Sequence, residues 1–586
     1  MRQWMVAAKK ADFYAIAEKF HVDPVVARII RNREVIGEKN IRIYLGGNLS
    51  DLSDPHQMKD MDRLVEILAQ KIRKQVRIRI IGDYDVDGVT SSHLFLTALR
   101  RVGAKVDVVI PHRIQDGYGL SLHLLQQAKE DGVDTILTCD NGIAAIDEIA
   151  WAKAQKMTVL VTDHHAVPFE EHEGRRTEKK SLADAVVNPH QQDCGYPYKE
   201  LCGAGVAWNV IRVLYENYDM DKREAEDLLD FVAMATVCDV MSLTGENRIL
   251  VKEGLKRIRH TKNIGLQALM QACNVQPENI SAYHFGYVLG PCVNATGRLD
   301  TARHALRLFE TGQETEAEEI ARDLVDLNQE RKELTLQGVE MAKKLCEEGG
   351  YENDPVLVLF LPDVHESIAG LIAGRIREMY NRPVFVLTRG EEGVKGSGRS
   401  TENYSMYENM CGCAELFTKF GGHPMAAGLS LPEENVEKFR RKINENCPLT
   451  VEEVCPDIHI DMAMPVGYAS TELVHQFALL EPFGKDNPSP LFADRNLSIS
   501  RMWVIGKNRN VLRMSVLSEY GQPVSVIFFG DVETLFAYFT EKFGQEEMEN
   551  ALHGRKNRIL FSMVYTAKID FYQGNENLQL EMKYYR

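Results

Sequence analysis

The chain has 586 residues, too many for one hydrophobic core, and the usual size of domains predicts three or four of them. Its apolar and charged fractions, 44% and 26%, are ordinary for a soluble protein. No apolar run is long enough to span a bilayer and the N-terminal sequence has no signal-peptide pattern, which predicts a cytoplasmic protein with no membrane partner. A net charge of −16 excludes a wholly basic surface but permits a local basic groove, and the 11 cysteines follow neither a disulfide nor a zinc pattern.

The first half of the chain predicts a helical segment followed by a parallel sheet. Residues 1–75 have a mostly helical pattern and no obvious chemistry. From Val76 short apolar runs alternate with amphipathic stretches, which is typical of parallel strands joined by right-handed helical crossovers. The expected strands are 76–82, 105–110, 134–139, 158–161 and 185–187, with helices at 90–102, 121–131 and 143–155 and a more helical stretch at about 203–259.

The second half predicts a connector and two further domains. Residues 314–348 favour one long helix, best explained as a link between domains, because they contain good helix formers at apolar spacing and no proline. A second α/β pattern follows, with a strand at 356–361, a helix at 367–380 and a strand at 384–388. From about residue 457 short strands predict a small barrel or sandwich. The predicted fold class is therefore α/β, with domains at 1–75, 76–260, 261–348, 349–446 and 457–586.

Acidic and histidine residues stand at the ends of the expected strands. Carboxylates and imidazoles are poor core residues because unpaired buried charge is costly, but they are suitable ligands for Mn²⁺ or Mg²⁺. Ligands of parallel sheets bind beyond the carboxyl ends of the strands, where these residues fall. Two such metal ions would suit a phosphodiester hydrolase. The residues are Asp83, Asp85 and Asp87, then Asp140, then Asp163, His164 and His165, then Asp239.

The first acidic group matches no simpler motif. It is not an EF-hand, because Leu94 occupies the twelfth position from Asp83, and it is not a P-loop, because no Gly-Lys-Ser/Thr follows. Alternation predicts that its three carboxylates share one side of an extended segment, with a helix from Val89 whose N-terminus could receive a phosphate. A strand-end cap or a solvated carboxylate explains any one of these groups better than a metal does. It does not explain four groups at consecutive strand ends.

These four groups resemble the four motifs of the DHH phosphoesterase superfamily, and residues 82–90 (GDYDVDGVT) resemble its RecJ branch. The resemblance extends over nearly the whole chain. Residues 294–299 (NATGRL) are similar to a signature of that branch, and 396–400 (GSGRS) and 420–428 (FGGHPMAAG) resemble signatures of its second domain, called DHHA1. Residues 480–488 resemble the segment that opens its terminal OB-fold. The resemblance implies a metal-dependent exonuclease that degrades single-stranded DNA from 5′ to 3′ in DNA repair and recombination.

The resemblance also implies roles for individual residues. Asp85 and Asp140, with Asp83, would hold one of two Mn²⁺ or Mg²⁺ ions. Asp87, Asp140, His164 and Asp239 would hold the other, so that Asp140 bridges them. Asp163 would orient His164, and His165 would touch the scissile phosphate. Expected contacts to phosphate or nucleic acid are Asn294, Arg298, Arg399, Ser400, Gly421, Gly422 and His423.

Basic and aromatic residues give weaker indications. The basic stretches at 71–79 and 501–513 are each more typical of a solvated face than of a nucleic-acid contact. In the tail, aromatic residues beside basic ones could stack on bases, although aromatics in strands are more often core. The residues are Trp503, Phe528 and Phe529, beside Arg501, Lys507 and Arg509.

Two other functions remain open. One is a phosphodiesterase of the same superfamily acting on short oligonucleotides or small phosphorylated nucleotides, against which the length of the chain argues. The other is a catalytically silent replication scaffold, against which the complete set of expected ligands argues. Departures from the branch pattern, such as Cys292 where arginine is usual and Val364 where tryptophan is usual, leave the expected ligands in place. Expected partners are single-stranded DNA and a single-strand-binding protein or repair helicase.

Overall fold

The structure is a computed structural model that describes residues 3–586 except 114–115, 117–118, 173–174, 300, 352, 391–392, 507–509 and 573. The chain forms two compact units. The first comprises Leu49–Pro456, and the second combines Gln3–Asn48 with Asp457–Arg586. None of the described helices combines the length and apolarity needed to cross a membrane.

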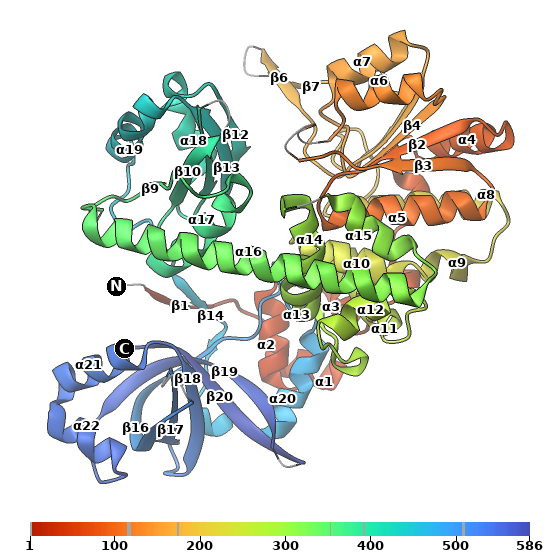
Figure 1. Cartoon of the computed structure of the whole chain (residues 1–586). Coiled ribbons are helices and arrows are strands. Elements are labelled where there is room, and N and C mark those ends of the chain that lie inside the picture. Colours follow the sequence, from red (N-terminus) through yellow and green to blue (C-terminus); the bar gives the residue numbers. More distant parts are fainter. Residues whose placement is uncertain are drawn as a thin grey trace. The chain divides into compact units, whose positions relative to one another are not determined.

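A five-stranded parallel sheet forms the larger α/β part of the first unit (Figure 1). The central strands are almost wholly buried, since both faces of the sheet are covered by helices, as is usual for parallel sheets. This confirms the predicted parallel sheet. In spatial order the strands are β3 (Lys105–Val109), β2 (Arg77–Ile81), β4 (Thr135–Cys139), β5 (Thr158–Thr162) and β8 (Ala185–Val187).

Different helices cover the two faces of this sheet. One face packs against α4 (Met61–Arg73), α5 (Val86–Arg101) and α8 (Gly203–Asn217), in a core that continues into the helical region after α8. The other face packs against α6 (Leu122–Glu130) and α7 (Ile146–Ala154) (Figure 1). A small hairpin of β6 (Phe169–His172) and β7 (Arg175–Glu178), which the sequence did not predict, lies between β5 and β8 in the chain.

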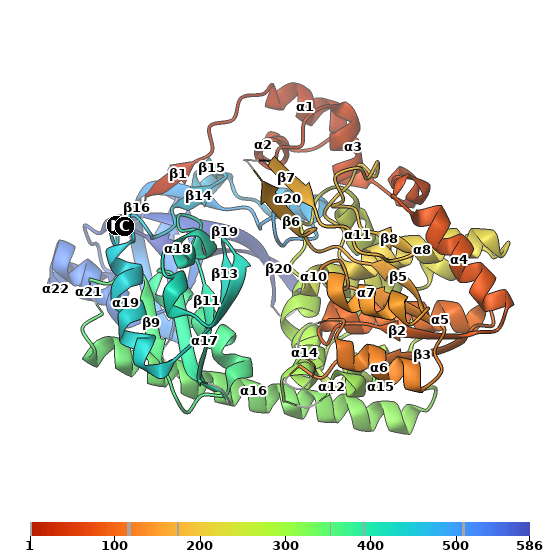
Figure 2. The ribbon, with the colours of Figure 1, turned by 90° about the horizontal axis from the view of Figure 1, so that it is seen from above.

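Short helices lead from the sheet to the long helix α16 (Glu314–Glu348), whose predicted bounds are confirmed. One end of α16 contacts α12, α14 and α15, and the other contacts α17 and β9 (Figure 2). It therefore connects two parts of the first unit, as expected. The helices between α8 and α16 are α9 (Lys222–Glu226), α10 (Leu229–Cys238), α11 (Gly245–Ile258), α12 (Ile264–Ala272), α13 (Ala282–His284), the π-helical turn η4 (Phe285–Leu289), α14 (Gly290–Leu299) and α15 (Ala302–Glu310).

The second part of this unit is a smaller α/β domain. Its five-stranded sheet has the order β12-β13-β11-β10-β9, in which only β9 and β10 are parallel. Helix α17 (Glu366–Tyr380) packs on one face of this sheet. The other elements are β9 (Leu357–Phe360), β10 (Val384–Gly390), β11 (Gly393–Arg399), α18 (Met406–Cys411), β12 (Lys419–His423), β13 (Ala426–Leu431) and α19 (Val436–Glu445).

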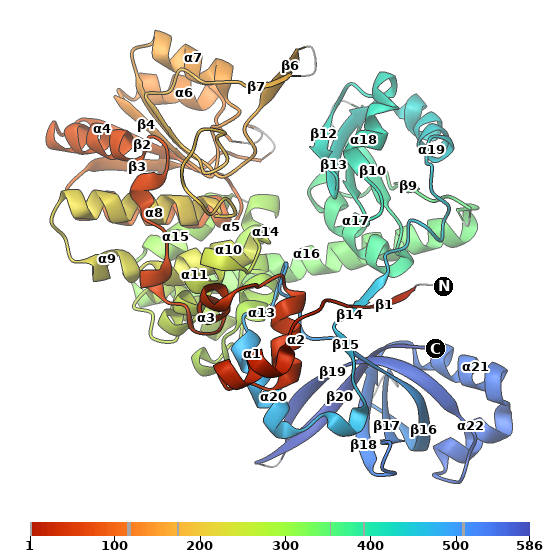
Figure 3. The same cartoon turned by 180° about the vertical axis from the view of Figure 1, so that it is seen from behind.

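The second unit is a closed β-barrel with helices from both ends of the chain. Its strands pair in the order β16-β17-β18-β20-β19, and β19 pairs again with β16. Residues of α1 and α2 share a hydrophobic core with the barrel and lie beside α20 (Figures 1 and 3). The segment 1–75 predicted from sequence is thus divided between the two units. The elements are β1 (Trp4–Val6), α1 (Phe13–Phe20), α2 (Pro24–Asn32), α3 (Glu38–Gly46), β14 (Ile458–Ile460), β15 (Met462–Ala463), α20 (Thr471–Phe477), β16 (Phe492–Ile505), β17 (Val511–Leu517), β18 (Pro523–Phe529), α21 (Val532–Phe543), α22 (Gln545–Leu552), β19 (Leu560–Tyr572) and β20 (Asn575–Tyr585).

Candidate metal centre and phosphate-binding surface

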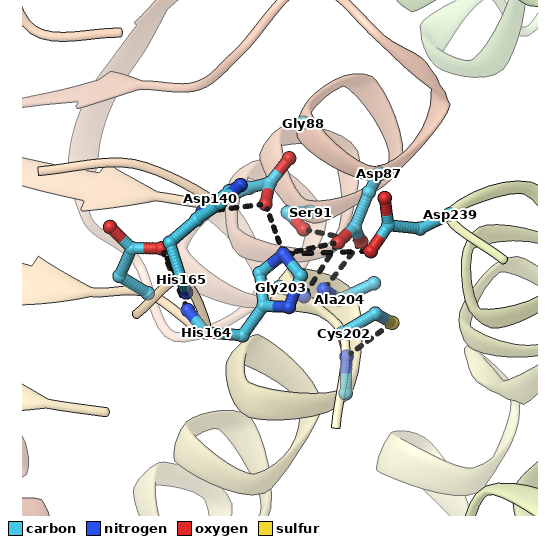
Figure 4. Close-up of polar contacts among 12 residues, drawn as sticks. Asp87, Gly88, Ser91, Asp140, His164, His165, Cys202, Gly203, Ala204 and Asp239 are labelled. Atoms are coloured by element: carbon cyan, nitrogen blue, oxygen red, sulfur yellow. Dashed lines mark hydrogen bonds and ion pairs between the residues drawn. The ribbon is translucent and has the colours of Figure 1, made fainter. Parts of the chain in front are cut away.

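The acidic and histidine residues predicted from sequence converge at the carboxyl ends of the central strands. Asp83 follows β2, Asp140 follows β4 and His164 follows β5, as expected. The expectation was wrong for Asp239, which caps the C-terminus of helix α10 instead of following a strand. Their side chains form three groups in which the possible ligand atoms lie within 4.8 Å of one another. The groups are Asp83, Asp85 and Asp140; Asp87, His164 and Asp239; and Asp140, His164 and His165. Figure 4 shows the second and third groups.

The segment that carries the first three carboxylates differs from the extended strand that its alternation predicted. Helix α5 begins at Val86, and Asp85 is its N-cap, accepting a hydrogen bond from Gly88 N at 3.0 Å. Asp87 therefore lies in the first helical turn. Because the chain bends at this cap, Asp83 and Asp85 belong to one group and Asp87 belongs to another.

The carboxylate of Asp87 is held by the N-terminus of a second helix, α8. Its Oδ2 accepts a hydrogen bond from Gly203 N at 2.6 Å, and its Oδ1 accepts one from Ala204 N at 2.7 Å (Figure 4). A helix N-terminus carries free N–H groups and a partial positive charge, which fixes a negatively charged side chain in place. The Oδ2 atom of Asp87 also lies 3.7 Å from His164 Nε2.

Sequence reasoning missed Gly203. A Cβ atom at this position would lie 2.6 Å from the Asp140 Cβ and 2.9 Å from its Oδ1. Only glycine therefore lets α8 approach the site closely enough to bind Asp87. The available signal was the run of small residues 203–205 (GAG) before an apolar helical pattern.

Asp140 and His164 form the centre of the site. Asp140 Oδ1 lies 3.0 Å from His164 Nε2, yet neither atom has a hydrogen-bond partner among the described residues, and Asp83 Oδ1 also has none. His164 Nε2 is 3.6 Å from Asp239 Oδ2. Asp140 also has a left-handed backbone conformation (φ 61°), which is uncommon except for glycine, asparagine and aspartate. Buried polar atoms without partners require an explanation, and a bound cation supplies one.

The pKa values of this group reflect a concentration of negative charge. Burial, together with the carboxylate of Asp85, raises the pKa of Asp83 to about 8. Burial and the surrounding carboxylates, first Asp87, also raise the pKa of Asp140 well above its usual value. Because nearby like charges and desolvation both disfavour carboxylate ions, the cluster favours the binding of positive charge.

Asp163 contacts His165 rather than the ring of His164. Its Oδ1 accepts hydrogen bonds from the backbone N–H groups of His164 (2.7 Å) and His165 (3.0 Å) and lies 2.8 Å from His165 Nδ1. Its Oδ2 accepts one from Ile143 N at 2.9 Å. Burial opposes protonation of His165, but the hydrogen bond to Asp163 and the nearby carboxylates outweigh it and raise its pKa to about 9. In the metal-free protein the surroundings of His165, at the edge of the site, therefore favour its protonated form.

A pocket of about 790 Å³ lies over the smaller sheet of the first unit. Both predicted glycines line it: Gly421 leaves open space where a Cβ would be, and Gly422 (φ 153°) allows a close approach to Ala426 O. Arg113, which the sequence analysis did not single out, lines the pocket from the larger α/β part, with Lys395 and Lys419 from the smaller sheet. Glu366 also lines the pocket and pairs with Lys395 at 2.8 Å. Arg113 and Lys419, beside accessible backbone, are therefore the cationic side chains that would suit an anion.

Arg298 and Arg399 belong to a group of arginines that repel one another. Arg298 donates a hydrogen bond to Ser367 O at 2.6 Å. Burial, followed by the charges of Arg113, Arg331 and Arg399, lowers the pKa of Arg298 to about 10. Burial and neighbouring arginines also lower the pKa of Arg399. An anion such as phosphate would relieve this repulsion.

Three other expected contacts have different surroundings. Asn294 Oδ1 accepts a hydrogen bond from Val86 N at 3.2 Å, and Gly297, one turn later on α14, packs against Tyr84 O, so this helix supports the acidic segment. The Ser400 hydroxyl is buried and donates to Tyr404 O at 2.6 Å, which leaves it no proton for a phosphate in this arrangement. His423 is exposed at the end of β12.

The basic and aromatic stretches divide into paired, core and exposed residues. Arg77 at the start of β2 and Arg79 in its middle form ion pairs with Asp107 in the middle of β3. Lys71 pairs with Asp134, just before β4, at the opposite end of the strand from Asp140. In the barrel Phe528 is buried, whereas Trp503 and Phe529 are exposed and the Arg501 guanidinium lies 5.7 Å from the Trp503 ring. Lys507 and Arg509 lie outside the described residues.

Three family models match successive parts of the chain. They are the N-terminal domain of the DHH family at residues 77–236, the DHHA1 domain at 353–447 and the RecJ OB domain at 460–584. These regions coincide with the parallel sheet, the smaller α/β domain and the barrel, which confirms the predicted fold class.

Similar proteins extend over almost the whole chain. The sequence is 32% identical over 582 residues to the single-stranded-DNA-specific exonuclease RecJ of Haemophilus influenzae, covering 96% of both chains. It is 33% identical to the RecJ of Bacillus subtilis over 512 residues, 87% of this chain but 63% of that longer protein. The crystal structure of RecJ in complex with Mn²⁺ from Thermus thermophilus matches with a TM-score of 0.81 and 25% identity, over 100% of this chain and 79% of that one.

Proposed function

The chain belongs to the RecJ family of single-stranded-DNA-specific exonucleases, and we propose that it hydrolyses phosphodiester bonds of single-stranded DNA from the 5′ end, in DNA repair and recombination. The observation that carries this proposal is the convergence of five carboxylates and the imidazole of His164, from separate elements, into two adjoining ligand groups. Relatives with the same domains are named as exonucleases of this kind.

The residues present fit two divalent metal ions. Oxygen donors with one imidazole suit Mn²⁺ or Mg²⁺ better than a thiolate-binding metal. Adjacent ligands of a six-coordinate ion with bonds of about 2.1 Å lie roughly 3 Å apart, which is the separation of Asp140 Oδ1 and His164 Nε2 (3.0 Å). The unpartnered buried oxygens of Asp83 and Asp140 supply the donor atoms that a cation would use.

We assign the ligands in two sets that share Asp140. Asp83, Asp85 and Asp140 would hold one ion, and Asp87, Asp140, His164 and Asp239 the other. When bound, such a pair of ions polarises the phosphodiester and makes hydroxide available at neutral pH. The N-terminus of α8 fixes the Asp87 carboxylate, so that little reorganisation is needed during the reaction.

We assign His165 to the scissile phosphate and Asp163 to positioning. The hydrogen bond to Asp163 raises the pKa of His165, and in the metal-free protein the carboxylates of Asp239 and Asp87 raise it further, to about 9. A protonated His165 would donate a hydrogen bond to a phosphate oxygen as negative charge develops there. Asp163 fixes the ring through Nδ1, which directs Nε2 away from Asp163. Arg298 and Arg399, with Arg113, would neutralise further phosphates of the strand.

A cytoplasmic location follows from this function in a DNA-processing enzyme. We propose a single-strand-binding protein or a repair helicase as the partner that presents the strand. In the barrel, Trp503 beside Arg501 offers a stacking surface for a base of a long strand.

A comparison of substrates tests the proposed function. With Mn²⁺ or Mg²⁺, the protein should digest a long 5′-phosphorylated single strand rapidly and a blunt duplex far more slowly. The reason is that we expect the strand to thread between the two α/β parts of the first unit, where a duplex would be too wide to enter. A dinucleotide should be a poorer substrate than the long strand. Equal rates on single strand and duplex would contradict the proposal. Preference for the dinucleotide would favour the short-oligonucleotide phosphodiesterase, and no digestion would favour the silent scaffold.

The stability of the metal-free protein should fall as the pH rises from about 6 to about 9. Asp83 and His165 both have a higher pKa in the folded protein than their usual values of 3.8 and 6.5. The folded protein therefore holds protons that the unfolded chain has released, and rising pH favours unfolding. In chelator, the midpoint of thermal unfolding should drop by about 2 °C or more over this range. Saturating Mn²⁺ should reduce the drop, and a midpoint that rises with pH in chelator would contradict these assignments.

A further inference from the structure

Two exposed tyrosines stack on each other in the helical region that follows α12. Tyr283 in α13 and Tyr287 in η4 are four residues apart, which places them on one face of a helix. Their ring centroids are 5.0 Å apart with an interplanar angle of 23°, and 62% and 70% of their surfaces are exposed. The pair thus presents flat aromatic surface to solvent instead of packing in the core.

The helical turn that carries Tyr287 is attached to the segment of a metal ligand. The Cys238 thiol donates a hydrogen bond to Phe285 O at 3.3 Å, and Cys238 immediately precedes Asp239. Gly290, at the end of the same turn, leaves room for the Cys238 sulfur, which would lie 2.3 Å from a Cβ there. The tyrosine pair is therefore fixed relative to Asp239 by direct contacts within one domain.

The backbone on both sides of this contact is unusual. Residues 285–289 form a π-helical turn, a rare conformation that occurs frequently at functional sites. Val240, directly after Asp239, is 62% exposed and has a left-handed backbone (φ 55°), which is strained for a β-branched residue. A strained backbone conformation persists only where the surrounding structure enforces it, and such conformations are frequent at active sites.

We propose that Tyr283 and Tyr287 form a stacking platform for an unpaired base of the DNA strand, next to the Asp239 side of the metal site. The proposal rests on the proposed function, since the turn that carries Tyr287 contacts Cys238, the residue before the assigned ligand Asp239. Every base has a π-face, so stacking on tyrosine suits an enzyme that digests strands of any sequence. A base paired in a duplex has no free face for such contact, so the platform also contributes to selection of single strands.

Equilibrium binding in chelator tests the platform without requiring hydrolysis. Single strands carry one 2-aminopurine, whose fluorescence is quenched by stacking, at successive positions from the 5′ end. In the double variant Y283L/Y287L, quenching at one position should be lost and the dissociation constant should rise about tenfold, the effect typical of a lost stacking contact. The matched variant Y283F/Y287F keeps both rings and should bind like the wild type. Y520L, which changes an exposed tyrosine of the barrel unit, is the surface control.

An abasic nucleotide separates stacking from a structural role. At the position that occupies the platform, it should weaken wild-type binding about as much as Y283L/Y287L does and should have no further effect in that variant. Wild-type affinity of Y283L/Y287L for every strand would overturn the proposal, as would a loss that is the same wherever the abasic nucleotide stands. If the platform binds bases but the protein with Mn²⁺ does not digest the strand, the proposed function fails and the platform stands.

Discussion

Replacement of Asp140 with asparagine is expected to lower the rate of single-strand hydrolysis by about 10²-fold or more. Asp140 belongs to two ligand groups and faces His164, so it is placed to touch both ions. Asparagine is preferred to alanine here because Asp140 has a left-handed backbone, which asparagine tolerates and alanine does not. The change then removes the charge and little else. Initial rates on a 5′-labelled single strand, with saturating Mn²⁺, measure the effect.

Stability distinguishes a lost ligand from a damaged fold. Burial and neighbouring carboxylates disfavour the ionised form of Asp140, so metal-free Asp140→Asn should be at least as stable as the wild type. The control is Asp134→Ala at the opposite end of the same strand, where Asp134 pairs with Lys71. It should keep near-wild-type activity. A folded and fully active Asp140→Asn protein would contradict the two-metal assignment.

Replacement of Gly203 with alanine should reduce hydrolysis by about a hundredfold although Gly203 carries no side chain. The added Cβ would lie 2.6 Å from the Asp140 Cβ, so either Asp140 or the start of α8 must move. Movement of α8 would also weaken the two hydrogen bonds that hold Asp87. Displacement of catalytic groups by about 1 Å can cost this much in rate. The affinity for Mn²⁺, measured by calorimetry, should fall together with the rate.

Gly205→Ala is a matched control in the same helical turn. Its Cβ would meet Leu201 side-chain atoms at 3.4 Å, an ordinary contact, and Gly205 is equally buried. It should retain activity within a few-fold of the wild type. If both variants lost activity equally, the effect would come from the stability of α8 and not from the approach to Asp140.

The sequence predicted those parts of the fold that local patterns determine. The strands of the parallel sheet and the full length of α16 follow from apolar periodicity and from the absence of proline, and the structure has them where they were expected. The acidic residues could be placed at one edge of the sheet because parallel strands have their carboxyl ends on one side. Which carboxylates group together required the structure, because the early start of α5 at Val86 depends on the Asp85 cap and on the support of Asn294 from a distant helix.

Contacts between distant segments could not be predicted. Gly203 approaches Asp140, and Ala204 binds Asp87 although the two residues are 117 positions apart in the chain. The basic stretch at 71–79 could be interpreted as a surface, yet Lys71, Arg77 and Arg79 form ion pairs with Asp134 and Asp107. The sequence did not indicate that Arg113 lines the pocket, because a single arginine outside any motif forms no recognisable pattern. The role of such a residue depends on which distant segments pack against it in the folded protein.

The composite second unit has a consequence for vectorial synthesis. Residues 3–48 leave the ribosome first, but Val26, Ile29 and Ile30 are buried in a core completed by the barrel after Asp457. At about 5–20 residues per second, these apolar faces wait roughly half a minute or more for their partner. The nascent chain is therefore expected to need shielding of its N-terminal helices by a chaperone. A catalytic fragment meant to stay soluble should begin at Leu49 as well as end at Pro456.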